Sequence, residues 1–231
     1  SINPIETESP DEEIIVLGQM FVSTMIEGMS FVPSFAQWLN NYDQSQGLED
    51  FKTILKYLQW QEPSRRGCKW ILKSPSHLCY TEDAAKAFPD ALLIMTHRDP
   101  LEVVPSFTSM EAALYKLSAT ISDEEAGRFW GKRLAEWMHR FEASRAKIGE
   151  ERFIDIDYRE VGREPLVQAR RVLERMGIAS EGLDEVLGEF MEGNKREQRP
   201  LHDYSLGRFG LDTEEIRRDF ASYRARYIDR G

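Results

Sequence analysis

Residues 91–100 read ALLIMTHRDP, and this stretch decides the fold class. The run Ala91–Met95 is continuously apolar and has the length of a β-strand that is buried on both faces. Asp99 is a typical helix N-cap and Pro100 suits the first helical position, so a helix is predicted to begin there. The stretch therefore indicates a buried strand that passes into a helix, as in a parallel α/β sheet.

Two further short strands are predicted on either side of this one. Trp70–Leu72 is a short apolar run that enters Lys73-Ser74-Pro75-Ser76-His77, and Phe153–Ile156 is the third run. Helices are predicted over the first segment to residue 62, over residues 77–87, from Pro100, and over the charged tail from Gly182. Amphipathic spacing is clearest at Phe51, Ile54, Leu55 and Leu58, at Trp130, Leu134, Trp137, Met138 and Phe141, and at Leu166, Ala169, Leu173 and Met176. Strands alternating with helices predict right-handed crossovers and a parallel sheet covered by helices on both faces.

We expect residues 1–231 to form a single α/β domain. It divides into a helical region (residues 1–62), an α/β core (69–176) and a helical C-terminal region (177–231). Three strands are fewer than the about five that are usual in such sheets. The chain also opens at Ser1 without an initiator methionine. We therefore expect that part of the sheet lies upstream of Ser1.

Composition excludes several classes of protein. The chain has 30 basic and 40 acidic residues and a formal charge of −10, which argues against a nucleic-acid surface. No window approaches the ~18 uninterrupted apolar residues of a membrane span. The two cysteines, Cys68 and Cys79, cannot form a disulfide framework or a four-ligand zinc site, which fits a reducing cytoplasm. No cluster of metal ligands is apparent, so no metal is predicted.

Cationic residues gather where two of the predicted strands end. Lys73 and His77 follow the first strand and Arg98 follows the second. Ligands of open α/β sheets bind beyond the carboxyl ends of the strands, where helix N-termini offer unpaired N–H groups. In a chain of net charge −10, such a cluster indicates an anion site. The alternative is that Lys73 and Arg98 are ordinary solvated charges.

Ser106 favours a phosphate as the anion. At ~100° per residue it lies on the same helix face as Asp99, two turns further along. Pro105, just before it, is expected to kink the helix. An arginine fork and a hydroxyl that converge on one point suit a phosphate monoester, which offers several acceptor oxygens. The alternative is a helix-capping Asp-Pro with an incidental serine.

At these residues the chain resembles a known family. Residues 72–77 (LKSPSH), 88–91 (FPDA), 97–100 (HRDP) and 103–106 (VVPS) resemble the central block of sulfotransferases that use 3′-phosphoadenosine 5′-phosphosulfate (PAPS), especially the bacterial type with Lys-Ser-Pro-x-His. Residues 158–161 (YREV) and 202–206 (HDYSL) resemble downstream segments of the same family. The resemblance implies a P-loop-like sulfotransferase fold, with residues 1–62 on the acceptor side and residues 69–176 holding the nucleotide.

The resemblance also implies roles for five residues. Arg98 and Ser106 match the pair that holds the 3′-phosphate, and Tyr158 matches a tyrosine near adenine. Lys73 matches the lysine near the oxygen that bridges the 5′-phosphate and the sulfuryl group. His77 occupies the region of the catalytic histidine, and imidazole, with an unperturbed pKa of ~6.5, suits a general base.

Two departures from the family pattern affect this assignment. The family's glutamate after the tyrosine is Arg159 here, and the phosphosulfate loop Gly-x-x-Arg-Ser/Thr-Gly-Thr/Ser does not occur in the 231 residues. The missing loop agrees with the low strand count. If His77 is not the base, His97 or a carboxylate from outside this chain would replace it.

The function implied is in-line transfer of a sulfuryl group from PAPS to a hydroxyl or amine, leaving adenosine 3′,5′-bisphosphate. The expected acceptor is a small molecule of either an apolar or a glycosidic class. The sequence does not fix the oligomeric state. The alternatives are a kinase-like nucleotide-binding α/β enzyme and a non-catalytic adenosine-bisphosphate-binding fragment.

His139 is expected on the surface, and Trp38, Trp60, Trp130 and Trp137 in the core. His202 and Tyr204 either close over the nucleotide or pack.

Overall fold

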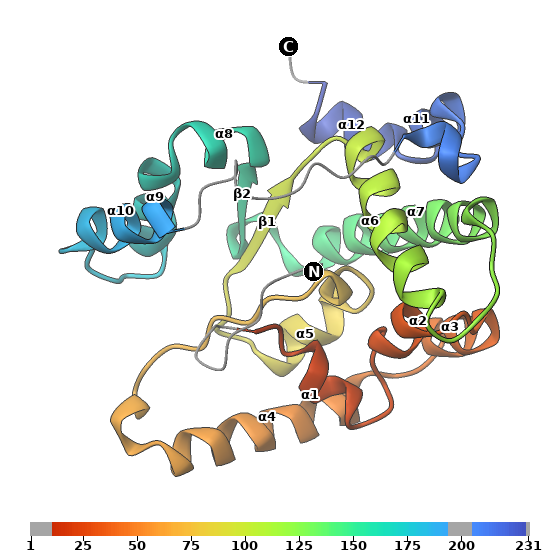
Figure 1. The fold of residues 1–231 in the computed structure, drawn as a ribbon. Helices are drawn as coiled ribbons and strands as arrows, with labels where there is room; N and C mark the ends of the chain where they lie inside the picture. Colours follow the sequence, from red (N-terminus) through yellow and green to blue (C-terminus); the bar gives the residue numbers. More distant parts are fainter. Residues whose placement is uncertain (1–10, 194–204, 230–231) are drawn as a thin grey trace.

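A two-stranded parallel sheet lies at the centre of the fold (Figure 1). The computed structural model of the chain describes residues 11–193 and 205–229. Strand β1 (Leu93–His97) pairs with β2 (Phe153–Asp157) in a register that runs from Leu93↔Phe153 to His97↔Asp157. The predicted parallel α/β arrangement is confirmed, but β1 is not buried on both faces as predicted, since Ile94 is 44% exposed.

Two long helices connect these strands. Helix α6 (Pro100–Tyr115) begins where the sequence predicts, because the Asp99 carboxylate accepts a hydrogen bond of 3.0 Å from the Leu101 N–H. Helix α7 (Asp123–Ile148) begins with a capping box. Trp130 and Trp137 on α7 are each 1% exposed and belong to the main core, as predicted.

The first segment is helical, as predicted, and packs around a second core. Its helices are α1 (Ile14–Gly18), α2 (Met25–Met29), α3 (Pro33–Asn40) and α4 (Ser45–Gln61). The second core joins α1 and α4 to α5 (Thr81–Ala87). Trp38 and Trp60 are 47% and 66% exposed, so their predicted core position is wrong. Trp60 follows the buried Phe51 by nine positions, about 180° around the helix, and therefore faces outward.

The first predicted strand is also wrong. Trp70–Leu72 shows no strand pairing among the described residues, and Ile71 is 77% exposed. A strand forms only where a neighbouring backbone completes its ladder. Just beyond this run, the N–H of Lys73 bonds instead to a carboxylate oxygen of Glu13, at 2.7 Å. The helix predicted over residues 77–87 is divided into a 3₁₀ turn, Pro75–Leu78, and α5.

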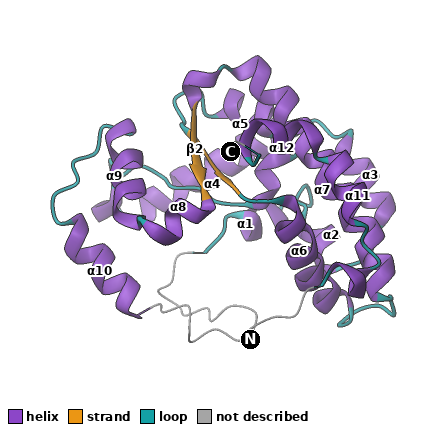
Figure 2. Ribbon diagram, turned by 90° about the horizontal axis from the view of Figure 1, so that it is seen from above, coloured by secondary structure: helices purple, strands orange, loops and turns teal. Residues whose placement is uncertain are grey.

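The remaining elements flank the sheet and close its end. Figures 1 and 2 show α8 (Tyr158–Arg163), α9 (Pro165–Arg175) and α10 (Leu183–Gly193) on one side of the sheet and α6 and α7 on the other. Helices α11 (Thr213–Asp219) and α12 (Ala221–Tyr227) follow a 3₁₀ turn, Leu206–Phe209. The Tyr227 ring stacks on His97 at the end of β1, with ring centres 4.0 Å apart. None of the helices described is both long and apolar enough to cross a bilayer.

Candidate active site

Arg98 and Tyr158 directly follow the two paired strands. Because the register ends with His97 opposite Asp157, the next residue of each strand leaves the sheet at the same edge. The guanidinium carbon of Arg98 lies 4.7 Å from the centre of the Tyr158 ring, in a cation–π contact. The structure thus brings together two of the predicted nucleotide-binding residues.

This edge of the sheet also carries the N-terminus of α6. The 16-residue helix presents the positive end of its dipole there, although Pro100 has no N–H and the next three N–H groups already bond to Asp99. Arg98 donates from Nε to Glu102 Oε2 at 2.9 Å, one turn into the helix. Ser106 is half-buried in the second turn, and the described hydrogen bonds and ion pairs do not link it to Arg98.

Lys73 and His77 lie on a loop that is stabilised by hydrogen bonds of its own serine hydroxyl groups. Ser74 caps the 3₁₀ turn by accepting from the Ser76 N–H at 3.2 Å, and its hydroxyl donates to Ser76 Oγ at 2.9 Å. Ser76 is buried, and its hydroxyl also bonds to Thr24 Oγ1. The segment between α1 and α2 therefore holds this loop in place.

Two glutamates just before α1 contact both predicted catalytic residues. Glu12 pairs with the exposed Lys73 ammonium. Glu13 is 8% exposed, and its carboxylate bonds to His77 Nε2 with one oxygen and to the Lys73 N–H with the other. Burial alone would raise the pKa of the Glu13 carboxyl, but the hydrogen bond and charge of His77, with backbone N–H bonds, bring it below its usual value.

Sequence reasoning did not identify these glutamates as site residues. The acidic run at residues 11–13 suits the start of a helix, and α1 does begin at Ile14. However, Glu13 makes no capping bond with its side chain and turns to His77 instead. No basic residue lies near Glu13 in the sequence, so no local pattern pointed to its partner.

His97, the alternative base, has a structural role. It is 4% exposed, and its Nε2 lies 2.7 Å from Asp155 Oδ1 and its Nδ1 3.2 Å from the Tyr223 hydroxyl. Both ring nitrogens are therefore engaged within the protein. His139 is exposed, as predicted, whereas His202 and Tyr204 lie outside the described residues.

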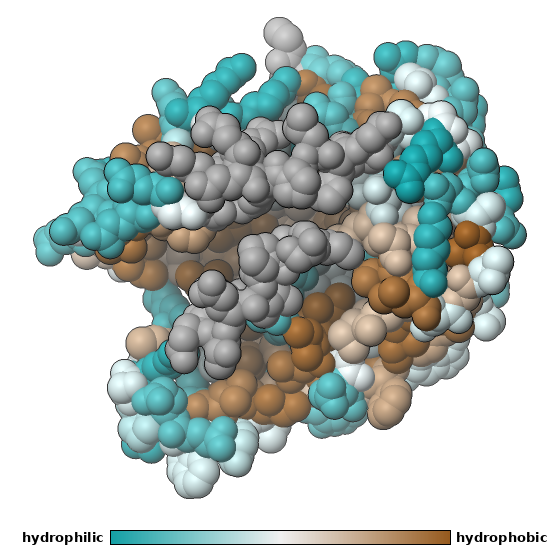
Figure 3. All heavy atoms as spheres, viewed as in Figure 1, coloured by the Kyte–Doolittle hydropathy of each residue, from teal (hydrophilic) through white to brown (hydrophobic). Residues whose placement is uncertain are grey.

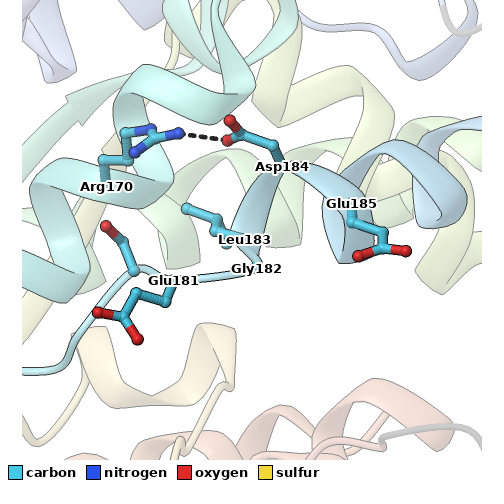
Figure 4. A pocket seen from close by; sticks show the side chains of 7 residues that line it. Arg170, Glu181, Gly182, Leu183, Asp184 and Glu185 are labelled. Atoms are coloured by element: carbon cyan, nitrogen blue, oxygen red, sulfur yellow. Dashed lines mark hydrogen bonds and ion pairs between the residues drawn. The ribbon is translucent and has the colours of Figure 1, made fainter.

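A separate cavity of about 380 Å³ lies at the turn between α9 and α10. Figure 4 shows the Arg170–Asp184 ion pair across it. Its lining residues are Arg170, Ser180, Glu181, Gly182, Leu183, Asp184 and Glu185. None of these is a predicted site residue, and the mixed charge does not resemble an anion site.

Two solved structures of sulfotransferases have a fold similar to that of this chain. The chain is similar to sulfotransferase STF9 from Mycobacterium avium, with a TM-score of 0.86 and 28% identity, over 95% of this chain and 56% of that one. It is also similar to sulfotransferase STF1 from Mycobacterium tuberculosis H37Rv, with a TM-score of 0.79 and 25% identity, over 95% and 57% of the two chains. The chain thus spans somewhat more than half of each structure.

Sequence comparison gives the same family. The omega-hydroxy-beta-dihydromenaquinone-9 sulfotransferases Stf3 of Mycobacterium bovis and M. tuberculosis are each 25% identical over 134 residues. This match covers 55% of this chain and 33% of each relative. The model of the sulfotransferase family matches residues 2–182. On this match, together with the motifs and the fold, the chain belongs to the sulfotransferase family.

Proposed function

We propose that this chain binds the nucleotide and provides the proton acceptor for sulfuryl transfer from PAPS to an acceptor hydroxyl or amine. The observation that carries the proposal is the Arg98–Tyr158 pair at the carboxyl edge of the sheet, in a chain of the sulfotransferase family. A cation above an aromatic ring beside a helix N-terminus fits a ligand that has both phosphates and a base. PAPS supplies the sulfuryl group and leaves as adenosine 3′,5′-bisphosphate.

In this proposal the nucleotide is held mainly by α6 and the strand ends. Arg98 binds the 3′-phosphate with its planar fork, helped by the Ser106 hydroxyl and the positive end of the α6 dipole. Tyr158 lies on the adenine side. Such contacts hold the donor in register with the acceptor and contribute to binding more than to the chemical step.

His77 and Lys73 contribute the chemistry. The acceptor oxygen or nitrogen forms a bond to sulfur while the bond from sulfur to the bridging phosphate oxygen breaks. His77 takes the proton of the acceptor. The Lys73 ammonium neutralises the charge that develops on the leaving phosphate, and losing such a contact typically costs about 10²–10³ in rate.

We place the acceptor on the side of α1 and α2. These helices flank the Lys73–His77 loop through Glu13 and Thr24. In Figure 3, hydrophobic side chains gather over α1, α2 and α6, and Ile15 and Met29 are 46% and 54% exposed. An apolar surface beside the base favours an apolar acceptor. The relative Stf3 is named as a sulfotransferase of omega-hydroxy-beta-dihydromenaquinone-9, so a hydroxylated menaquinone is the first acceptor to assay.

Titration with adenosine 3′,5′-bisphosphate by calorimetry tests the nucleotide site. We expect saturable binding, and Arg98→Ala should weaken it about 10- to 100-fold, the effect of losing charge-assisted hydrogen bonds. Arg217→Ala, an exposed arginine on α11, is the matched control. ATP with Mg²⁺ tests the kinase alternative, and preference for ATP would refute the proposal.

Turnover separates binding from chemistry. With PAPS and a hydroxylated menaquinone, His77→Ala should lower kcat while leaving the affinity for adenosine 3′,5′-bisphosphate within about twofold. If His77→Ala turns over normally, another group is the base. If the wild-type chain binds the bisphosphate without turnover, it is the non-catalytic binding fragment instead.

A further inference from the structure

One carboxylate joins the two predicted catalytic residues, although it lies some 60 positions away in sequence. Glu13 Oε1 bonds to His77 Nε2, and Glu13 Oε2 accepts from the Lys73 N–H at 2.7 Å. The carboxylate is buried, so both bonds are shielded from water and strengthened. Each oxygen therefore has its own partner in the loop.

This contact assigns the proton on the imidazole. The pKa of the Glu13 carboxyl is lowered, so the group is an anion that can only accept hydrogen bonds. His77 Nε2 must then carry a hydrogen to donate to it. In the neutral ring the lone pair is left on Nδ1, which has no hydrogen-bond partner among the described residues and is enclosed. Because this atom has no accessible surface, an acceptor hydroxyl reaches it only when the side chains around the ring move aside.

We infer that Glu13 is a positioning residue for sulfuryl transfer, which fixes His77 in its Nε2–H tautomer and anchors the Lys73 backbone at the same time. In that tautomer only Nδ1 can take the proton of the acceptor, and this requires the enclosed atom to be uncovered when the acceptor binds. This inference rests on the proposed function only for the catalytic role of His77. The tautomer itself is a property of the chain.

Glutamine at position 13 cannot replace both contacts. A carboxylate has two accepting oxygens, whereas an amide has one accepting oxygen and one donating NH₂ group. Glu13→Gln therefore either loses the Lys73 N–H bond or presents a donor to Nε2, which then favours the other tautomer. Glu13→Asp keeps two accepting oxygens on a shorter side chain, so it should recover part of the function.

Long-range ¹H–¹⁵N NMR of the ¹⁵N-labelled chain at a pH of about 9, where imidazoles are neutral, reads the tautomer directly. The chain has four histidines, and His77→Gln identifies the signal of His77. We expect Nε2–H in the wild type, a shift toward Nδ1–H in Glu13→Gln, and the wild-type tautomer in Glu13→Asp. Glu49→Gln is the matched control, because Glu49 is an exposed carboxylate on α4. A wild-type His77 that is mainly Nδ1–H overturns the inference without any variant.

Kinetics give the second measurement. Glu13→Gln should lower kcat about 10- to 100-fold, as expected when a base is held in the wrong tautomer, with the affinity for adenosine 3′,5′-bisphosphate within about twofold. Unchanged kcat in Glu13→Gln also overturns the inference. If the wild type does not bind the bisphosphate, or if His77→Ala turns over normally, the proposed function is refuted instead. The tautomer measured by NMR would still show whether Glu13 sets the proton position on His77.

Discussion

The Arg98 guanidinium lies over the ring of Tyr158, with 4.7 Å between its carbon and the ring centre. The two residues are 60 positions apart, and the contact exists because parallel pairing aligns His97 with Asp157. Tyr158 is 41% exposed, so the contact is at the surface. The guanidinium thus contacts the Tyr158 ring and also donates to Glu102.

Replacing Tyr158 by leucine should therefore weaken nucleotide binding modestly. A cation–π contact at an exposed site contributes about 0.5–1 kcal/mol, so we expect the Kd for adenosine 3′,5′-bisphosphate to rise about two- to fivefold. Tyr158→Phe keeps the ring and should bind as the wild type does. Calorimetry measures both, with Tyr57→Leu on α4 as the control. Equal losses in the two Tyr158 variants would mean that the hydroxyl, not the ring, is the contact.

Asp155 joins β2 to the buried face of α7 and to His97. It accepts from Arg145 at 2.6 and 2.7 Å, and Arg145 is only 3% exposed. Burial alone would raise the pKa of the Asp155 carboxyl, but bonds from His97 and Arg145 bring it well below its usual value. Replacing it by asparagine leaves Arg145 with Glu150 as its remaining carboxylate partner among the described residues.

We expect Asp155→Asn to lower the free energy of unfolding by about 2 kcal/mol at pH 7, less than for a fully buried pair because Asp155 is a third exposed. Because the folded-state pKa is lowered, this stabilisation is present above the unfolded value of about 4 and is lost as the pH falls further. Urea unfolding of both proteins should therefore converge at acid pH. The exposed pair Arg170–Asp184 supplies the control, Asp184→Asn, which should change stability by less than about 0.5 kcal/mol. A difference that persists unchanged to pH 3 would contradict this explanation.

Local patterns in the sequence predicted the central strands and the helix that holds the site. The apolar run Ala91–Met95 overlaps β1, although the strand extends to His97. Asp99 with Pro100 sets the start of α6 because capping is a local interaction. Their relative placement then follows from parallel pairing alone. The family resemblance assigned Arg98 and Tyr158 to one nucleotide site, and parallel pairing explains why the two residues meet.

Contacts between distant segments could not be predicted in the same way. Trp70–Leu72 has the composition of a strand, but a strand also needs a second strand to pair with. The backbone N–H of Lys73, just after this run, bonds to the carboxylate of Glu13 instead. Likewise, Glu13 suits a helix start in sequence, and its contact with His77 arises only from the packing of α1. The helix face with Phe51 and Leu55 is buried as its spacing predicts, and the same spacing places Trp60 on the opposite side, so its expected core position disagreed with the pattern itself.

Gly127 on α7 allows the 3₁₀ turn at Leu206–Phe209 to approach the helix closely. A Cβ at this position would lie 2.0 Å from the backbone oxygen of Phe209, whose own side chain is fully buried. Gly127→Ala should therefore force the turn away and lower the free energy of unfolding by about 1–3 kcal/mol. Gly188→Ala on α10 is the control, because nothing lies within 4 Å of its added methyl group. It should be neutral or stabilising by up to about 1 kcal/mol, and thermal unfolding measures both.

Glu111 on α6 is buried beside the Glu27–Arg133 ion pair. Glu27 is fully buried and receives two hydrogen bonds from the Arg133 guanidinium, at 2.8 and 2.9 Å. Glu111 is 5% exposed, and its Oε2 has no hydrogen-bond partner among the described residues. Burial, with the charge of Glu27 adding to it, raises the pKa of the Glu111 carboxyl to about 8. The folded chain thus holds a proton at neutral pH that the unfolded chain releases.

Glu111→Gln should therefore change how stability depends on pH. For a carboxyl with a raised folded-state pKa, stability is fully present below the unfolded value of about 4 and falls as the pH rises toward the folded one. The fall approaches ~1.4 kcal/mol per pH unit between about 5 and 8. Glutamine has no proton to lose, so urea unfolding should show this slope in the wild type and not in Glu111→Gln, which becomes the more stable protein near pH 8. Glu27→Gln provides the contrast, since it leaves the Arg133 charge buried and should destabilise by about 3–5 kcal/mol. Parallel pH profiles for the wild type and Glu111→Gln would show that Glu111 is ionised in the folded chain.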